Sequence, residues 1–205
     1  MLPNWRRTTS PSAWTFTPTG DVSVPMMSNG EGNATLWSGT GCNAATLDYA
    51  GGTTSMILLV PDAGTFGAFE QGLTAGGLTS TLTSTSSAMG IVTMPRFKFS
   101  TPSLLNSVLA ALGMTDAFDA LLADFSAMDG SRDLSVGTVI HKAVIAVDEK
   151  GTTAAAATGV SVGITAIRMD WPTLVVDRPF LFFIRHNPTG AILFQGRVLD
   201  PSQAQ

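Results

Sequence analysis

Residues suited to acid–base, redox or metal chemistry are scarce in this chain of 205 residues. It has one cysteine, Cys42, and two histidines, His141 and His186. A lone cysteine excludes an intrachain disulfide, and three such residues without short spacing make a poor zinc site. The Gly30-x-Gly32 pair lacks the third glycine and the following helix of a phosphate-binding loop. We therefore expect a protein that binds or inhibits, without a metal or cofactor, and not an enzyme.

Charge is also sparse. Only 13% of the residues are charged, the eleven Lys and Arg residues are scattered, and the net charge is −4. This excludes the basic patch that nucleic acid or a heparin-type polyanion requires. No apolar run reaches the roughly 18 residues of a membrane span. The basic start MLPNWRR is not followed by an apolar stretch, so we expect no signal peptide and no membrane partner.

Hydrophobic residues, in contrast, make up 44% of the chain, and they occur in a series of short apolar segments. Alternating or continuous apolar residues predict strands, and a stripe of apolar residues every three or four positions predicts a helix. The result is an α+β fold with an excess of strands. The predicted strands are 14–17, 21–27, 34–37, 45–49, 55–60, 91–100, 138–147, 174–176, 180–184 and 191–198. The predicted helices are 64–73, 102–113 and 115–125, and residues 74–88 are ambiguous.

Three of these segments suggest where the core lies. The fully apolar strand 55–60 is expected to be covered on both faces. The strands 180–184 and 191–198, joined by a tight turn at 186–190, are expected to form a buried hairpin. His141 lies within the apolar strand 138–147 and is therefore predicted to be a core histidine.

The segment from Asp148 to Phe180 has an unusual composition. Gly151 to Gly159 is rich in glycine, alanine and threonine, and strict alternation follows from Val160 to Thr165. Alternation is typical of a half-buried strand, yet Gly and Ala are poor strand formers. By composition alone the segment is most often a flexible surface linker. The alternative is a mobile loop that can become a strand.

Five stretches resemble the serpins, a family of suicide inhibitors of serine and cysteine proteases, and they occur in the family's order. These stretches are VSVPMM (22–27), TSMILLVPD (54–62), MPRFKFS (94–100), LSVGTVIHKAVIAVDEKGTTAAAATG (134–159) and DRPFLFFIRHNPTGAILFQGRVLDP (177–201). The resemblance implies a single serpin-like domain over residues 1–205, with mixed sheets, a few helices and an exposed reactive-centre loop. Residues 148–179 would be the hinge and that loop, and residues 1–20 match the family poorly.

In the family, a protease cleaves the loop, and the loop then inserts into a sheet as a new strand. Small residues would allow insertion, and a proline at Thr152 or Ala154 would obstruct it. The resemblance makes Glu149 the hinge acid, for which we predict an ion pair with Arg96, and it matches His141 to a mid-sheet histidine. The hinge residues that it implies are Glu149, Gly151, Thr152, Ala154, Ala156 and Thr158.

The resemblance leaves two positions open for the cleaved bond. Counting from Glu149 and Gly151 gives Thr165–Ala166, which predicts an elastase- or subtilisin-like target. Counting back from Asp177 to Phe180 gives Arg168–Met169, which predicts a trypsin-like target. We favour the first count, because the length of the inserted strand sets how far the protease is carried.

Family members are about twice as long as this chain, and the resemblance covers their C-terminal half. We therefore expect the N-terminal half of the fold to be missing and strand 138–147 to have an open edge. A complementing half is a possible partner besides the target protease. The alternative function is a truncated, non-inhibitory binding or structural protein. The resemblance implies an extracellular location.

Overall fold

The computed structural model describes residues 5–8, 12–14, 22–30, 32–82, 87–149 and 170–202. These residues form two compact units. The first comprises the described residues within 1–98 and 146–204, and the second comprises Phe99–Ile145. None of the described helices is long and apolar enough to span a membrane.

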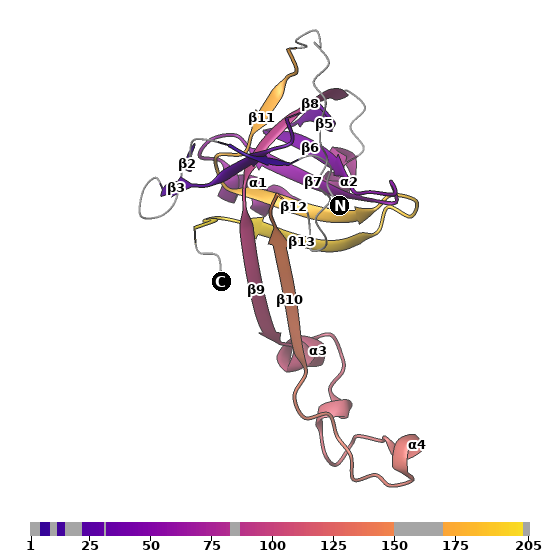
Figure 1. The fold of residues 1–205 in the computed structure, drawn as a ribbon. Coiled ribbons are helices and arrows are strands. Elements are labelled where there is room, and N and C mark those ends of the chain that lie inside the picture. Colours follow the sequence, from indigo (N-terminus) through magenta and orange to yellow (C-terminus); the bar gives the residue numbers. More distant parts are fainter. Residues whose placement is uncertain are drawn as a thin grey trace. The chain divides into compact units, whose positions relative to one another are not determined.

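The first unit is built on a nine-stranded sheet (Figure 1). One part of it is an antiparallel ladder of β5 (Ala34–Gly39), β6 (Cys42–Asp48), β7 (Thr54–Pro61), β12 (Phe180–His186) and β13 (Ile192–Val198). β7 lies between β6 and β12, and Ser55 to Pro61 are all buried. This confirms the buried strand predicted from the continuous apolar run, since a central strand covered on both faces has no polar side.

The strand β8 (Ser87–Pro95) joins this ladder to the rest of the sheet. Its first half pairs with β5, and its second half pairs with β4 (Met26–Ser28). β11 (Thr173–Val175) runs parallel to its middle, and β1 (Arg6–Arg7) pairs with β4. A separate two-stranded sheet joins β2 (Ser12–Trp14) to β3 (Val22–Val24). The single strand predicted over 21–27 is therefore two, because Pro25 lacks the N–H that a continuous ladder needs.

Two helices cover part of the ladder and close the core. α1 (Phe66–Gly72) is the helix predicted over 64–73, and α2 (Ala75–Leu82) forms in the ambiguous segment. Phe69, Leu73, Leu78 and Leu82 pack on a buried cluster that comprises Trp37, Ala44, Ile57, Leu59, Phe66, Leu181 and Phe183. The weak helix propensity of α2, which contains two adjacent glycines, is thus outweighed by tertiary packing.

The C-terminal hairpin forms as predicted, but only one of its strands is buried. The turn is closed by hydrogen bonds from His186 N to Ala191 O and from Gly190 N to His186 O, both 2.8 Å long. Phe180 to Phe183 on β12 are buried, whereas Leu193 and Phe194 on β13 are about half exposed. The prediction of a buried hairpin is therefore wrong for β13, because β13 is an outer strand of the described sheet.

The second unit contains most of a two-stranded sheet formed by β9 (Phe97–Leu104) and β10 (Ile140–Val147). It also contains α3 (Asn106–Ala111), a single 3-10 turn (Asp116–Phe118) and α4 (Ser126–Asp129) (Figure 1). Asn106 fixes the start of α3, because its Oδ1 accepts from Val139 N at 2.9 Å and its Nδ2 donates to Gly137 O at 2.6 Å.

Three predictions fail in this unit. The helix predicted over 102–113 begins only at Asn106, since β9 continues through Pro102 to Leu104. Leu104, Val108 and Leu112 of that segment are exposed, with Leu112 at 79%. The helix predicted over 115–125 is reduced to the 3-10 turn. His141 is exposed and is not a core histidine, because β10 pairs with β9 alone among the described residues.

Candidate functional site

The two flanks of residues 150–169 are both attached to β8 or to the residue that follows it. On the N-terminal flank, Glu149 follows β10, and its Oε2 lies 3.7 Å from Nη1 of Arg96. On the C-terminal flank, Thr173, Leu174 and Val175 pair with Ile91, Val92 and Thr93. Glu149 and the strand Thr173–Val175, which flank residues 150–169 in the sequence, are therefore both anchored in the first unit.

Arg96 and Glu149 are the two side chains for which the family resemblance predicts an ion pair, and they lie in contact. The separation of 3.7 Å is that of an ion pair and is too long for a hydrogen bond. The arginine side chain is 36% exposed and the glutamate side chain is 23% exposed. A partly exposed pair of this kind contributes at most about 1 kcal/mol. Its role as a hinge remains a prediction.

One atom of Arg96 has no partner. The Nε atom is buried, and no acceptor among the described residues accepts a hydrogen bond from it. An unmade hydrogen bond by a buried donor costs roughly 1–3 kcal/mol, and more where the donor belongs to a charged group. The guanidinium is therefore held in a position that leaves it incompletely satisfied.

Behind Arg96, an aromatic cluster holds the backbone in place. The Phe97 ring lies 5.8 Å from Phe180 and 5.6 Å from Phe182, and Trp14 meets Phe180 edge-on at 6.0 Å. Trp14 also donates from Nε1 to the carbonyl of Leu199 at 3.0 Å. Because Phe97 is 2% exposed and packed on both phenylalanines, the neighbouring Arg96 projects from a rigid base.

The C-terminal flank depends on close approach to two glycines. A Cβ on Gly90 would lie 2.6 Å from the carbonyl oxygen of Pro172, and one on Gly32 would lie 2.5 Å from the Trp171 ring. Ile91 N donates to the same Pro172 oxygen at 2.9 Å. This docking was not predicted, although an isolated glycine in a strand pattern such as 87–95 signals close approach of another chain segment.

Asn29 is a further residue that the sequence analysis missed. It is 1% exposed, and its Oδ1 accepts from Val92 N at 2.9 Å. Its own N donates to Val92 O at 3.2 Å, so the side chain completes the pairing of β8 just beyond the end of β4. The β8 strand is thereby held at the residue that pairs with Leu174.

The remaining predicted loop residues lie outside the described part of the chain. These are Gly151, Thr152, Ala154, Ala156 and Thr158 in the hinge, and the alternative cleavage positions Thr165–Ala166 and Arg168–Met169. Their roles remain predictions. His141 is described, but it belongs to the second unit and is exposed. In the described residues, no group of three or more His, Cys, Asp or Glu side chains is arranged to hold a metal ion.

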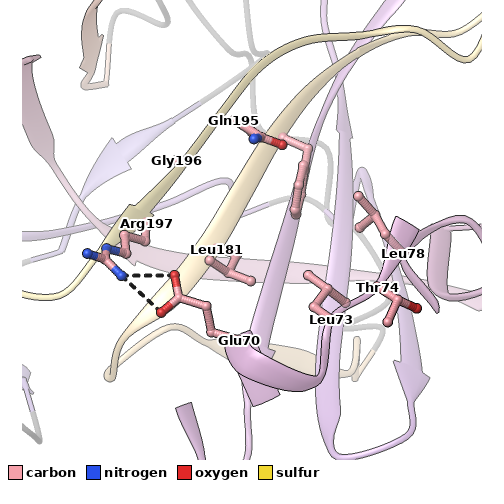
Figure 2. Close-up of a pocket in the computed structure, with 9 residues that line it drawn as sticks. Glu70, Leu73, Thr74, Leu78, Leu181, Gln195, Gly196 and Arg197 are labelled. Carbon is pink, nitrogen blue, oxygen red and sulfur yellow. Dashed lines mark hydrogen bonds and ion pairs between the residues drawn. The ribbon is translucent and has the colours of Figure 1, made fainter. Parts of the chain in front are cut away.

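A second concave site lies between the helices and the hairpin, with a volume of about 360 Å³. Its apolar wall includes Leu73, Leu78 and Leu181, and Gln195 lines it from β13 (Figure 2). At one end, Nη1 of Arg197 donates to both carboxylate oxygens of Glu70 at 3.0 Å. Apolar walls with a few polar groups at the rim suit a small amphipathic molecule. This pocket was not predicted from the sequence.

The serpin family model, described as a serine protease inhibitor, matches residues 5–201. Leukocyte elastase inhibitor A of Rattus norvegicus is 41% identical over 170 residues, which cover 78% of this chain and 44% of that protein. Intracellular coagulation inhibitor 2 of Tachypleus tridentatus is 37% identical, over 78% of this chain and 39% of that protein. The chain thus spans less than half the length of these relatives.

The fold is similar to that of solved serpins. Thyroxine-binding globulin in complex with thyroxine is 25% identical with a TM-score of 0.74, covering 97% of this chain and 54% of the other. Tengpin, a thermophilic serpin in its native state, is 26% identical with a TM-score of 0.71, covering 96% and 50%. The expectation of an extracellular location is not supported, because one relative is named an intracellular inhibitor. By the family match, the identities and the fold, the chain belongs to the serpin family.

Proposed function

We propose that this chain inhibits a serine protease of elastase-like specificity, as a substrate whose cleaved loop inserts as a strand. The observation that carries the proposal is the anchoring of both flanks of residues 150–169 on β8 and Arg96. A segment held at both ends and rich in small residues is suited to enter a protease cleft. The relatives named leukocyte elastase inhibitor support an elastase-like target, as does the predicted Thr165–Ala166 bond.

The mechanism follows from strand chemistry. After cleavage, the part of the loop that begins at Gly151 is free of its C-terminal anchor and can pair with a strand edge. In this part of the chain, Thr152, Ala154, Ala156 and Thr158 would share one face, where small side chains meet little steric resistance. Backbone hydrogen bonds along the new strand would supply the driving force. The proposed partner is therefore the target protease. A complementing N-terminal half as a second partner remains a prediction.

The direct test is to incubate the chain with pancreatic elastase and, separately, with trypsin. We expect a complex with elastase that survives a denaturing gel, and mass spectrometry of the released C-terminal peptide should begin at Ala166. A peptide that begins at Met169 would shift the bond to Arg168–Met169 and the target class to trypsin-like proteases. Cleavage by both proteases without any stable complex would contradict inhibition.

A second candidate function is the binding of a small molecule without inhibition. It is favoured by the 360 Å³ pocket beside β13 and by the similarity to a serpin named for thyroxine. Titration with a hydrophobic fluorescent probe would test the pocket. Leu78→Arg should abolish saturable binding of the probe, because it would place a charged side chain in the apolar wall of the pocket.

A further inference from the structure

Arg96, whose buried Nε has no acceptor among the described residues, lines a hollow that the proposed function does not use. The hollow has a volume of about 440 Å³, and four stretches of the first unit converge on it: β3, the junction of β8 and β9, the end of β10, and Pro201 with Ser202. Arg96 and Lys98 both line it. Asp148 is the acidic residue among those that line it, so basic groups outnumber acidic ones there.

The present position of Arg96 satisfies its guanidinium poorly. Nη1 reaches Glu149 only at 3.7 Å, and Nε is closed off from solvent with no acceptor in the part of the chain that the structure describes. A guanidinium binds best when Nε and one Nη donate together to two oxygens of a single planar or tetrahedral anion. Glu149 does not offer that arrangement here. An oxyanion in the hollow would accept from Nε and one Nη together once the guanidinium turned toward it.

We propose that this hollow is a binding site for a small oxyanion, a phosphate or carboxylate, held by Arg96 with support from Lys98. Turning toward the anion takes Nη1 away from Glu149, so anion binding and the Arg96–Glu149 ion pair exclude each other. Because Glu149 immediately precedes the segment of the proposed loop, occupancy releases its N-terminal anchor. This regulatory consequence rests on the proposed function, whereas the binding itself does not.

The test measures binding of inorganic phosphate and of succinate to the intact chain by isothermal titration calorimetry, with sodium chloride at matched ionic strength as reference. Saturable binding of either anion supports the site, and the comparison distinguishes phosphate from carboxylate. We expect Arg96→Met to weaken binding at least tenfold. Glu149→Gln should tighten anion binding about two- to fivefold. The substitution removes the carboxylate that competes for Arg96, and the factor corresponds to the free energy that a partly exposed ion pair contributes.

Arg132→Met provides the matched control, because Arg132 is an exposed arginine whose ion pair is with Asp124 in the second unit. It should leave anion binding unchanged. If Arg96→Met fails to fold by circular dichroism, Arg96→Lys takes its place, since it keeps the charge and lacks Nε. Equal binding by wild type and both Arg96 variants, no binding at all, or no tightening in Glu149→Gln would overturn the proposal. No protease is used, so failure of the inhibitor proposal would not affect this result.

Discussion

At the scale of single residues, Cys42 shows how burial sets reactivity. It is 3% exposed, and burial raises the pKa of its thiol. A raised pKa keeps the thiol protonated in the folded chain, and the thiolate is the reactive form. We therefore expect Cys42 to react with a disulfide reagent at pH 8 at least about tenfold more slowly in native buffer than in denaturant.

The same pKa shift gives a direction for stability. Because the thiol ionises more readily when unfolded, its contribution to stability is complete below the unfolded pKa and declines as the pH rises through it. Cys42→Ala should remove this decline from a plot of unfolding free energy against pH between 8 and 10. Fast, denaturant-independent labelling of the wild-type thiol would show that Cys42 is accessible and would contradict its buried position.

Asn29 is the residue whose loss should most weaken the middle of β8. Its Oδ1 is the acceptor for Val92 N, which is buried. Asn29→Ala would leave that N–H without a partner, and we expect a loss of about 1–3 kcal/mol in the free energy of unfolding, measured with urea. Asn43→Ala is the control, because the Asn43 side chain accepts a hydrogen bond from Ser38 at an exposed position. It should change stability by less than about 0.5 kcal/mol.

At the scale of elements, the docking of β11 depends on Gly90. A Cβ there would meet the Pro172 carbonyl at 2.6 Å, and backbone cannot yield as a flexible side chain can. Gly90→Ala should therefore cost about 1–3 kcal/mol and detach β11, seen as faster amide exchange of Ile91 and Val176. Gly67→Ala, in α1 with open space around it, should instead stabilise the chain by up to about 1 kcal/mol. Equal effects would contradict the docking.

The elements that could be predicted from sequence are those with a strong local pattern. The continuous apolar run of β7, the alternation of β10 and the turn residues at 186–190 each predicted the observed structure. The helix predicted over 102–113 forms only from Asn106 to Ala111, because β9 extends to Leu104 and takes up the first residues of the predicted segment. Alternation could not show that His141 is exposed, since that depends on which neighbours a strand acquires.

The candidate site was predictable in part. The pairing of Arg96 with Glu149 was accessible through family resemblance, since nothing local links residues 53 positions apart. The docking of Trp171 and Pro172 on Gly32 and Gly90, and the role of Asn29, required three-dimensional contacts. The pocket beside β13 is made by two helices and two strands distant in sequence, so no motif marks it.

At the scale of the whole molecule, the proposed inhibitor mechanism depends on insertion of the loop. Proline at position 154 would remove one backbone donor from the inserted strand. If that loss is worth about 1.4 kcal/mol, insertion should become about tenfold less competitive with release of the cleaved chain. Elastase should therefore cleave the Ala154→Pro variant as an ordinary substrate, with a correspondingly smaller yield of stable complex on a denaturing gel. Ala154→Ser, which keeps the N–H and the small size, should retain the wild-type yield.

The most direct test compares the melting temperature of the intact chain with that of the same chain cleaved once within residues 150–169. Insertion adds a strand and its hydrogen bonds, so the cleaved chain should melt at least about 4 °C higher, which corresponds to more than about 1 kcal/mol for a chain of this size. A cleaved sample that melts at the same temperature as the intact one, or lower, would show that the cleaved segment does not insert, and the inhibitor mechanism would be wrong.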